Sequence, residues 1–348
     1  MKKFIHIGFP KNFSTSLQRD FFAAHKAIFH LGIGPGIDYA DPVIDSAFEV
    51  YLKTAKRFKY NEHEKRLSDH FNEVFEKAAA SGKKVLTASS EHLSFSFAND
   101  SIDFEEKMHR VSKLFGSDTH IIMIIRNQAD LIKSLYRESV RVGFPGTYQD
   151  YIYLLYKYQD RNFYYDFRYD LVLEVLRNYF KAENIHLLLF EDFKPVGAGL
   201  TEEDGKIKLI SSLCALLEID YPVTPLNHSN EALSDGVVKV KSELNKTTRH
   251  DLGNILYDTA EKHRMKHYLQ NDLGLAEEND TLYGDVILKR QLIKDAETSN
   301  TFPADYKIDF TLPESLALPI RKFYEEGNNK LNAMSAVQLS APYFNLKF

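Results

Sequence analysis

The fold of this chain is decided by its N-terminal stretch, which reads Phe4-Ile5-His6-Ile7-Gly8-Phe9-Pro10-Lys11-Asn12-Phe13-Ser14-Thr15-Ser16-Leu17. Residues 4–9 predict a buried β-strand, residues 10–16 a sharp loop, and Leu17 onward a helix. The first N–H groups of a helix lack partners within the helix, and the helix dipole places positive potential there. A strand that leads into a hydroxyl-rich loop and a helix start, with a lysine beside it, therefore predicts a site for an anion such as phosphate.

Three further apolar runs predict strands, and helix-length segments separate the strands along the chain. Together with the first run, they span residues 4–9, 84–89, 120–125 and 185–190. This alternation predicts an α/β fold with a parallel β-sheet flanked by helices.

Beyond about residue 220 the strand signals fade, and three segments have the pattern of helices, over residues 231–246, 258–271 and 316–331. We therefore expect an α/β core over residues 1–235. Residues 236–348 are expected to form a mainly helical C-terminal extension, or cap, packed on that core.

Composition restricts the class of protein. The 348 residues are 44% hydrophobic, enough for one large domain or two closely packed ones. Net charge is only −5 with the two signs interspersed, so no general nucleic-acid surface is indicated. The single cysteine, Cys214, lies in an apolar run and is expected in the core. With no disulfide possible within the chain and no long apolar run, we expect a soluble cytoplasmic protein.

Chemically useful side chains follow three of the predicted strands directly. Lys11, Ser14 and Thr15 come after the first, Ser89-Ser90-Glu91-His92 end the second, and Arg126-Asn127 follow the third. In an open parallel sheet, ligands bind at the carboxyl ends of the strands. The three clusters are therefore expected to meet in one site.

The loop after the first strand is no Walker A loop, because Lys11 precedes the hydroxyl residues and no glycine flanks them. Its order, P-K-x-x-[ST]-T-x-L, resembles the 5′-phosphosulfate loop of sulfotransferases, which use 3′-phosphoadenosine 5′-phosphosulfate (PAPS). The matching residues are Pro10, Lys11, Ser14, Thr15 and Leu17. Phe13 stands where many members have glycine, and a bulky side chain there would limit how closely the backbone approaches a ligand.

The segment after the third strand resembles the 3′-phosphate motif of the same family, R-N-P-x-x-x-x-x-S-x-Y. Arg126, Asn127, Ser134 and Tyr136 match it without a gap, and Gln128 replaces the proline. We expect this replacement to be tolerated, because proline there mainly preorganises the helix start. An arginine can donate two hydrogen bonds to a phosphate oxygen pair, and Ser134 lies about two helical turns further on.

The resemblance covers most of residues 1–235 and a closing helix at 320–331. It implies a P-loop-like sulfotransferase fold that moves a sulfuryl group from PAPS to an acceptor hydroxyl or amine, releasing adenosine 3′,5′-bisphosphate without a metal. It further implies that Lys11 contacts the leaving-group oxygen, while Arg126 and Ser134 bind the 3′-phosphate. The 5′-phosphate would lie against the loop residues Lys11, Asn12, Phe13, Ser14, Thr15 and Ser16. The acceptor would be a small molecule or a glycan, with no nucleic acid or membrane as partner.

The general base is one of two neighbours, Glu91 or His92. Carbohydrate sulfotransferases of the heparan type place a glutamate at this position, and cytosolic sulfotransferases use a histidine from a corresponding region. Neighbouring side chains on an extended segment point to opposite sides, so only one is expected to serve, and we favour Glu91. Alternatively, Glu91 only caps the helix start after Ser90.

Two other functions remain open. A nucleotide kinase would need a Walker lysine after glycine and a magnesium-binding aspartate. A catalytically degenerate sulfotransferase fold would bind a nucleotide without turnover, and Phe13 motivates that alternative.

Several further residues are more simply explained by structure than by function. The tyrosines between residues 148 and 169 could form an acceptor platform, but packing is the expected role. Arg137 and Arg141 are expected to be solvated, and Glu191-Asp192-Phe193 to be structural. His263 and His267 have helical spacing, yet Arg264 replaces the glutamate of a zinc-protease motif, so no metal site is expected.

Overall fold

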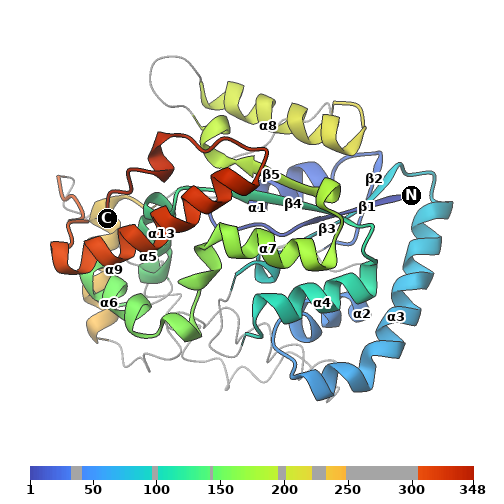
Figure 1. Cartoon of the computed structure of the whole chain (residues 1–348), viewed down its shortest axis with the longest axis horizontal. Coiled ribbons are helices and arrows are strands. Elements are labelled where there is room, and N and C mark those ends of the chain that lie inside the picture. Colours follow the sequence, from blue (N-terminus) through green and yellow to red (C-terminus); the bar gives the residue numbers. More distant parts are fainter. Residues whose placement is uncertain (33–40, 96–100, 142–143, 195–200, 222–232, 248–304) are drawn as a thin grey trace.

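The computed structural model describes residues 1–32, 41–95, 101–141, 144–194, 201–221, 233–247 and 305–348. At its centre is a five-stranded, all-parallel sheet flanked by helices on both faces (Figure 1), as the sequence predicted. The order β2-β3-β1-β4-β5 places β1 in the middle. The strands are β1 (Lys2–His6), β2 (Ile28–His30), β3 (Val85–Ser89), β4 (His120–Ile125) and β5 (Ile185–Leu189).

Four of the strands match the predicted runs, and β2 is an addition. β1 starts two residues earlier than predicted and already ends at His6. All five residues of β3 and the last five of β4 are buried, because both faces of the sheet are covered, as is typical of parallel sheets. β2 pairs Ile28 with Val85 of β3 at the sheet edge. With three residues it is too short to produce a recognisable periodicity, which is why sequence reasoning missed it.

Alternate residues of the strands enter two hydrophobic clusters, one on each face. Ile5 and Ile121 belong to the larger cluster, and Phe4 and Ile122 to the smaller. The larger cluster includes residues from α2 (Pro42–Ser46), η2 (Ala47–Tyr51), α3 (Arg57–Ala80), α4 (Phe104–Phe115), α5 (Gln128–Arg141), α6 (Tyr148–Lys157), α7 (Tyr169–Tyr179), α9 (Asp235–Thr247) and α13 (Glu314–Met334). The smaller cluster packs under η1 (Leu17–Phe22), which continues the one-turn α1 (Ser14–Ser16), and under α8 (Glu202–Leu217).

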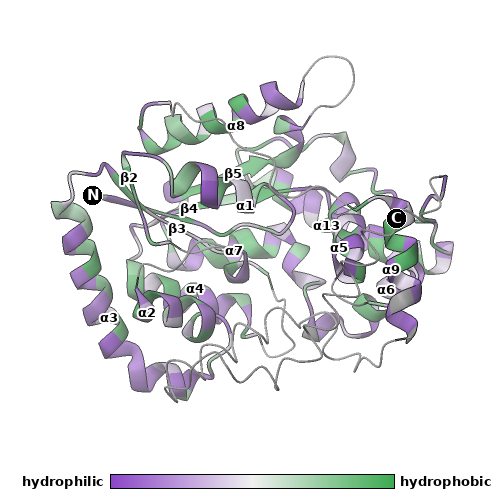
Figure 2. Ribbon diagram, turned by 180° about the vertical axis from the view of Figure 1, so that it is seen from behind, coloured by the Kyte–Doolittle hydropathy of each residue, from purple (hydrophilic) through white to green (hydrophobic). Residues whose placement is uncertain are grey.

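Short helical turns complete the described elements. They are η3 (Glu91–Leu93), η4 (Gln159–Arg161), η5 (Tyr165–Phe167), η6 (Ala182–Asn184), η7 (Phe190–Phe193) and η10 (Ala341–Tyr343). Figure 2 shows that the long helix α3 is largely hydrophilic, and only one stripe of it, including Leu67 and Phe71, is buried. Cys214 is buried in the smaller cluster, as expected, and burial raises the pKa of its thiol to about 11.

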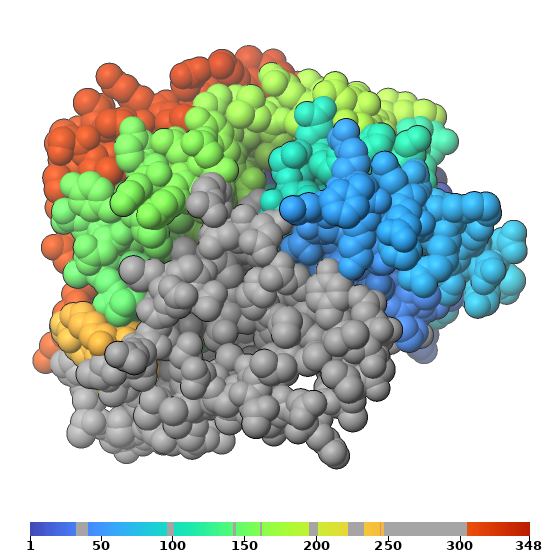
Figure 3. Space-filling model, turned by 90° about the horizontal axis from the view of Figure 1, so that it is seen from below, coloured from blue at the N-terminus to red at the C-terminus, as the bar shows by residue number. Residues whose placement is uncertain are grey.

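The described C-terminal segment, residues 305–348, contributes side chains to the larger hydrophobic cluster on the sheet. In Figure 3 its red segment lies alongside the green residues around 150–180, and α13 packs on α7. Gly327 makes this close approach possible, because a Cβ there would lie 2.4 Å from Arg168 Nε and 2.7 Å from Asp170 Oδ1, which form a buried ion pair. The predicted helix 231–246 corresponds to α9. The predicted helix 258–271, with His263 and His267, lies outside the described residues.

The strand order defines where a ligand can bind. From β1 the chain moves to β2 on one side of the sheet, whereas from β4 it moves to β5 on the other. Right-handed crossovers then place η1 on one face and α5 and α7 on the other. In open α/β sheets, ligands bind between the carboxyl ends of two strands whose connections leave in opposite directions, here β1 and β4, so a ligand is expected at this point.

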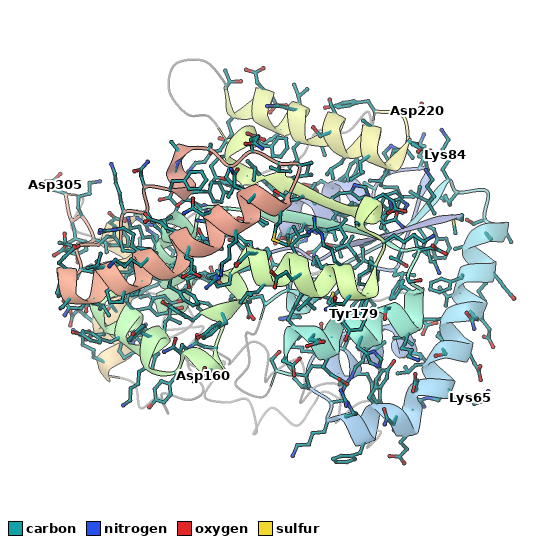
Figure 4. The ribbon with its side chains drawn as sticks, in the orientation of Figure 1. Lys65, Lys84, Asp160, Tyr179, Asp220 and Asp305 are labelled. Carbon is teal, nitrogen blue, oxygen red and sulfur yellow. The ribbon has the colours of Figure 1, made fainter. Side chains whose placement is uncertain are left out.

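The opposite edge of the sheet has a different character. It carries exposed ion pairs such as Lys84 with Asp220, 3.6 Å apart and labelled close together in Figure 4. Within the part of the chain that the structure describes, no helix is long and apolar enough to cross a membrane.

Candidate anion-binding site at the carboxyl edge of the sheet

The loop after β1 has a strained backbone. Lys11 and Phe13 adopt positive φ angles of 63° and 65°, a left-handed backbone conformation that residues other than glycine rarely adopt. Each such residue costs about 1–3 kcal/mol and persists only where its surroundings impose it. Phe13 thus adopts the left-handed conformation that a glycine at this position would adopt more readily. Its ring is stacked on Phe190, with 4.7 Å between the ring centroids.

Buried side chains fix this loop from below. Asn12 is fully buried, and its Nδ2 donates to the Ile124 carbonyl of β4 at 2.9 Å. Ser14 is also buried, and its hydroxyl contacts the Phe9 carbonyl at 3.3 Å and the Glu91 carboxyl. Gly8 is required beneath them, since a Cβ there would lie 2.5 Å from Ser14 Oγ. The side chains of Asn12 and Ser14, which were expected to face a ligand, therefore bond to protein groups.

A neutral polar layer lies under the same loop. His6 Nδ1 is 2.8 Å from Ser89 Oγ, and Gln18 Nε2 donates to the Ser89 carbonyl at 3.2 Å. Burial, with a smaller contribution from His30, lowers the pKa of His6 to about 3, so the ring is neutral at physiological pH. These groups hold the ends of β1 and β3 together without adding charge beneath the site.

Lys11 lies between two carboxylates. Its Nζ is 3.4 Å from Glu138 Oε2 on α5. Its charge also acts on Glu91, which lies on the turn after β3. The pKa of Glu91 is raised to about 7, because burial and the charge of Glu138 together outweigh the lowering effects of the Ser14 hydrogen bond and the Lys11 charge. A carboxyl with a pKa close to neutrality can accept a proton and release it again, which is the requirement for a general base.

Glu91 and His92 lie on the 3₁₀ turn η3, so the expectation of an extended segment was wrong. The Glu91 carboxyl bonds to Ser14 and interacts with the charge of Lys11, and a residue that only capped a helix would not need these contacts with the loop after β1. His92 is half-buried, and its carbonyl accepts from the buried Lys107 Nζ at 2.8 Å. Lys107 also reaches the Phe95 carbonyl at 3.4 Å, and so it fastens the turn that carries Glu91.

Arg126 follows β4 and reaches the loop after β1. Its Nη1 lies 3.5 Å from the Lys11 carbonyl, and its guanidinium lies 4.7 Å from the centre of the Phe190 ring. Burial lowers the pKa of Arg126, and the nearby Asp130 and Glu191 raise it, so the group stays charged. The Arg126 side chain therefore lies against the loop that carries Lys11.

Residues distant in sequence hold the backbone around Arg126. Tyr169 donates to the Arg126 carbonyl at 2.8 Å. Glu191 accepts from the Asn127 N–H at 2.9 Å and from the Tyr343 hydroxyl at 2.6 Å. The structural role expected for Glu191 is therefore confirmed in its contacts.

Gln128 does more than replace a proline. It is fully buried and exchanges hydrogen bonds with Asn328 of α13, Nε2 to Oδ1 at 2.8 Å and Nδ2 to Oε1 at 3.0 Å. Asn328 also donates to the Tyr343 carbonyl at 2.7 Å. The start of α5, and with it Arg126, is thus fixed to the C-terminal helix.

The remaining candidates take different places. Ser134 lies half-exposed on α5, whereas Tyr136 is buried and donates to the Gly146 carbonyl at 3.1 Å. Arg137 is held by Asp235 at 2.9 Å rather than solvated, and Arg141 is an exposed partner of Glu138.

The tyrosines divide into a buried group (Tyr148, Tyr151, Tyr164 and Tyr169) and an exposed one (Tyr153, Tyr156, Tyr158 and Tyr165). No cluster of three potential metal ligands occurs among the described residues.

Sequence reasoning missed four residues of this site: Gly8, Lys107, Glu138 and Phe190. The signal for Glu138 was available, because it lies one helical turn beyond Ser134 on the same predicted helix. Lys107 and Phe190 gave no signal, since each acts through tertiary contacts alone.

Comparison with solved structures gives a limited likeness. The crystal structure of a sulfotransferase from Alicyclobacillus acidocaldarius is similar to this chain, with a TM-score of 0.46 and 16% sequence identity over 75% of this chain and 96% of that chain. No family model matches the sequence, and no curated protein matches it. The function is therefore inferred from the sequence motifs and the geometry of the site.

Proposed function

We propose that this protein is a sulfotransferase that moves a sulfuryl group from PAPS to a hydroxyl or amine of a small-molecule or glycan acceptor. The observation that carries the proposal is the meeting of two motifs 115 residues apart, because Arg126 Nη1 lies 3.5 Å from the Lys11 carbonyl. Both motifs follow the carboxyl ends of β1 and β4, the edge of the sheet at which α/β proteins commonly bind nucleotides.

We infer that the site holds two phosphates of one nucleotide. Phe13, at the N-cap of α1, has no side-chain hydrogen-bond acceptor, so no N-cap side chain competes with an anion for the first helical N–H groups. Thr15 and Ser16 are partly exposed there and would bind the 5′-phosphate together with Lys11. Arg126 and Ser134 would bind the 3′-phosphate. Asn12 and Ser14 would support the loop from within.

In the proposed reaction, the acceptor oxygen attacks sulfur and forms the new S–O bond. The bond between sulfur and the bridging oxygen breaks, and its electron pair leaves with the 5′-phosphate of adenosine 3′,5′-bisphosphate. Lys11 would stabilise the charge that develops on that oxygen; one such donor is typically worth about 2.7–4 kcal/mol. Glu91 would take the acceptor proton, and its contact with Ser14 and proximity to Lys11 support it over His92.

Isothermal titration calorimetry with adenosine 3′,5′-bisphosphate tests the nucleotide half of the proposal. We expect binding in the micromolar range, stronger than that of adenosine 5′-phosphate. Absence of binding up to millimolar concentrations would reject the proposal.

A second candidate is nucleotide binding without turnover. The ion pair between Lys11 and Glu138 favours it, because Lys11 must leave or share that partner to assist a leaving group. Incubation with PAPS carrying radiolabelled sulfur and a panel of sugars, amines and phenols distinguishes the two. Labelled product from any acceptor would exclude the second candidate. A kinase finds less support, since Lys11 is not set in a Walker A loop.

A further inference from the structure

Side chains from three strand ends meet at one ring. Phe13 follows β1, Arg126 follows β4, and Phe190 begins η7 directly after β5. The Phe13 ring stacks on Phe190 with 4.7 Å between centroids and 28° between planes. The guanidinium carbon of Arg126 lies 4.7 Å from the centre of the same ring. We refer to these three residues as the Phe190 cluster.

Phe13 contributes rigidity to the cluster. Its φ of 65° is unfavourable for a side chain with a Cβ, and its half-buried ring is packed on Phe190. Two stacked aromatic rings attract each other in addition to the stabilisation that comes from burying their apolar surface. The stack therefore helps to hold the loop after β1 in the conformation that presents its N–H groups.

Phe190 and its neighbour hold the turn after β4 at two points. The Phe190 ring contacts the guanidinium of Arg126, and the Glu191 carboxylate accepts from the N–H of Asn127. Phe190 is 7% exposed, so its ring is fixed by the smaller hydrophobic cluster. A fixed ring face restrains the arginine side chain through cation–π attraction.

We propose that Phe190 is a positioning residue that sets the spacing between the 5′-phosphate loop and Arg126. Phe13 links the loop to Phe190, because its ring stacks on the Phe190 ring. This inference rests on the proposed function, because the two phosphates of one nucleotide define that spacing. The phenylalanine at position 13, which departs from the glycine of the resembling family, thereby gains a role in this chain.

The test is the preference for a 3′-phosphate, defined as the Kd for adenosine 5′-phosphate divided by the Kd for adenosine 3′,5′-bisphosphate. Phe190→Leu removes the aromatic face and keeps an apolar side chain. We expect it to lower this ratio about three- to tenfold, while the Kd for adenosine 5′-phosphate changes less. In turnover assays the same variant should raise the KM for PAPS more than it lowers kcat.

Phe193→Leu is the matched control. Phe193 is buried in the same turn and in the same hydrophobic cluster, and its ring neighbour is Lys208 rather than Phe13 or Arg126. It should lower the melting temperature without changing the ratio. A double-mutant cycle adds a second criterion: in an Arg126→Gln background, Phe190→Leu should no longer affect the ratio.

Phe13→Leu serves as a second variant, because Phe13 is partly exposed and tolerates substitution better than Phe190. It should lower the ratio about two- to threefold. An unchanged ratio in both variants, or an equal fall in Phe193→Leu, would overturn the inference and leave the proposed function standing. A wild-type protein without any preference for the bisphosphate would overturn both.

Discussion

The two turns that form the site are stabilised in contrasting ways. The loop after β1 combines left-handed backbone conformations at Lys11 and Phe13 with side-chain bonds to the ends of the two neighbouring strands, from Asn12 to the Ile124 carbonyl and from Ser14 to Glu91. The turn after β4 depends on contacts 43 to 218 residues away in sequence, from Tyr169, Glu191 and Tyr343. Local changes should therefore affect the chemistry at the first turn, and changes at the C-terminus should affect recognition at the second.

The largest effect should come from the first turn. Glu91→Gln keeps the shape of the side chain and removes the base, so kcat should fall by about 10²- to 10⁴-fold with little change in bisphosphate affinity. Steady-state kinetics with PAPS and an acceptor found in the panel would measure it. His92→Gln is the control on the same turn; a larger loss in that variant would transfer the role of base to His92.

Arg126→Gln should produce a smaller effect of a different kind. Loss of a charge-assisted hydrogen bond costs about 1.5–3 kcal/mol, so bisphosphate affinity should fall about 10- to 100-fold. The affinity for adenosine 5′-phosphate should change little, as calorimetry would show. If both ligands weakened equally, Arg126 would serve the whole loop rather than a 3′-phosphate.

Asn328→Leu tests the dependence of the second turn on the C-terminal helix. Gln128 and the Tyr343 carbonyl would each lose a buried partner, which should lower the free energy of unfolding by about 1–3 kcal/mol in urea titrations. The 3′-phosphate preference should fall as well.

Asn329→Leu is the control for that change, because its side chain is exposed and bonds only one turn back, to the Glu325 carbonyl. The free energy of unfolding and the 3′-phosphate preference should both stay at their wild-type values within experimental error. A fall in stability without any change in nucleotide preference would separate α13 from the site.

The smallest effect should be a shift in pH dependence. A base works when it is deprotonated, so kcat/KM should rise with pH and reach half its maximum near pH 7, the pKa of Glu91. Glu138→Gln removes a negative charge that raises this pKa, so the half-maximum should move to lower pH. Glu326→Gln, which alters an exposed carboxylate on α13, should leave the profile in place. An upward shift in Glu138→Gln would contradict the arrangement.

Much of the fold could be predicted because its signals are local. Runs of β-branched residues marked four strands, and a run of turn residues marked the loop after β1. β2 could not be predicted, since three residues carry no periodicity. The burial of Asn12 and Ser14 could not be predicted either, because a polar residue in a loop is usually exposed, and their partners, the Ile124 carbonyl and Glu91, are distant in sequence.

Gln128 shows the limit most clearly. In the sequence it is a substitution at a motif position, judged tolerable because proline would only have started a helix. In the structure it forms a buried amide pair with Asn328, 200 residues away. Such a contact leaves no trace in local periodicity, since each partner alone is an ordinary helical residue.

The sequence by itself determined the α/β class, four strands and the placement of Lys11, Glu91 and Arg126 at strand ends, because strand pattern and the parallel-sheet rule suffice for those. Tertiary structure decided which of these groups touch. It paired Lys11 with Glu138, directed Glu91 to Ser14 and placed Arg126 beside Phe190. The physical reason is that periodicity arises from neighbours along the chain, whereas charge pairing, burial and stacking arise from neighbours in space.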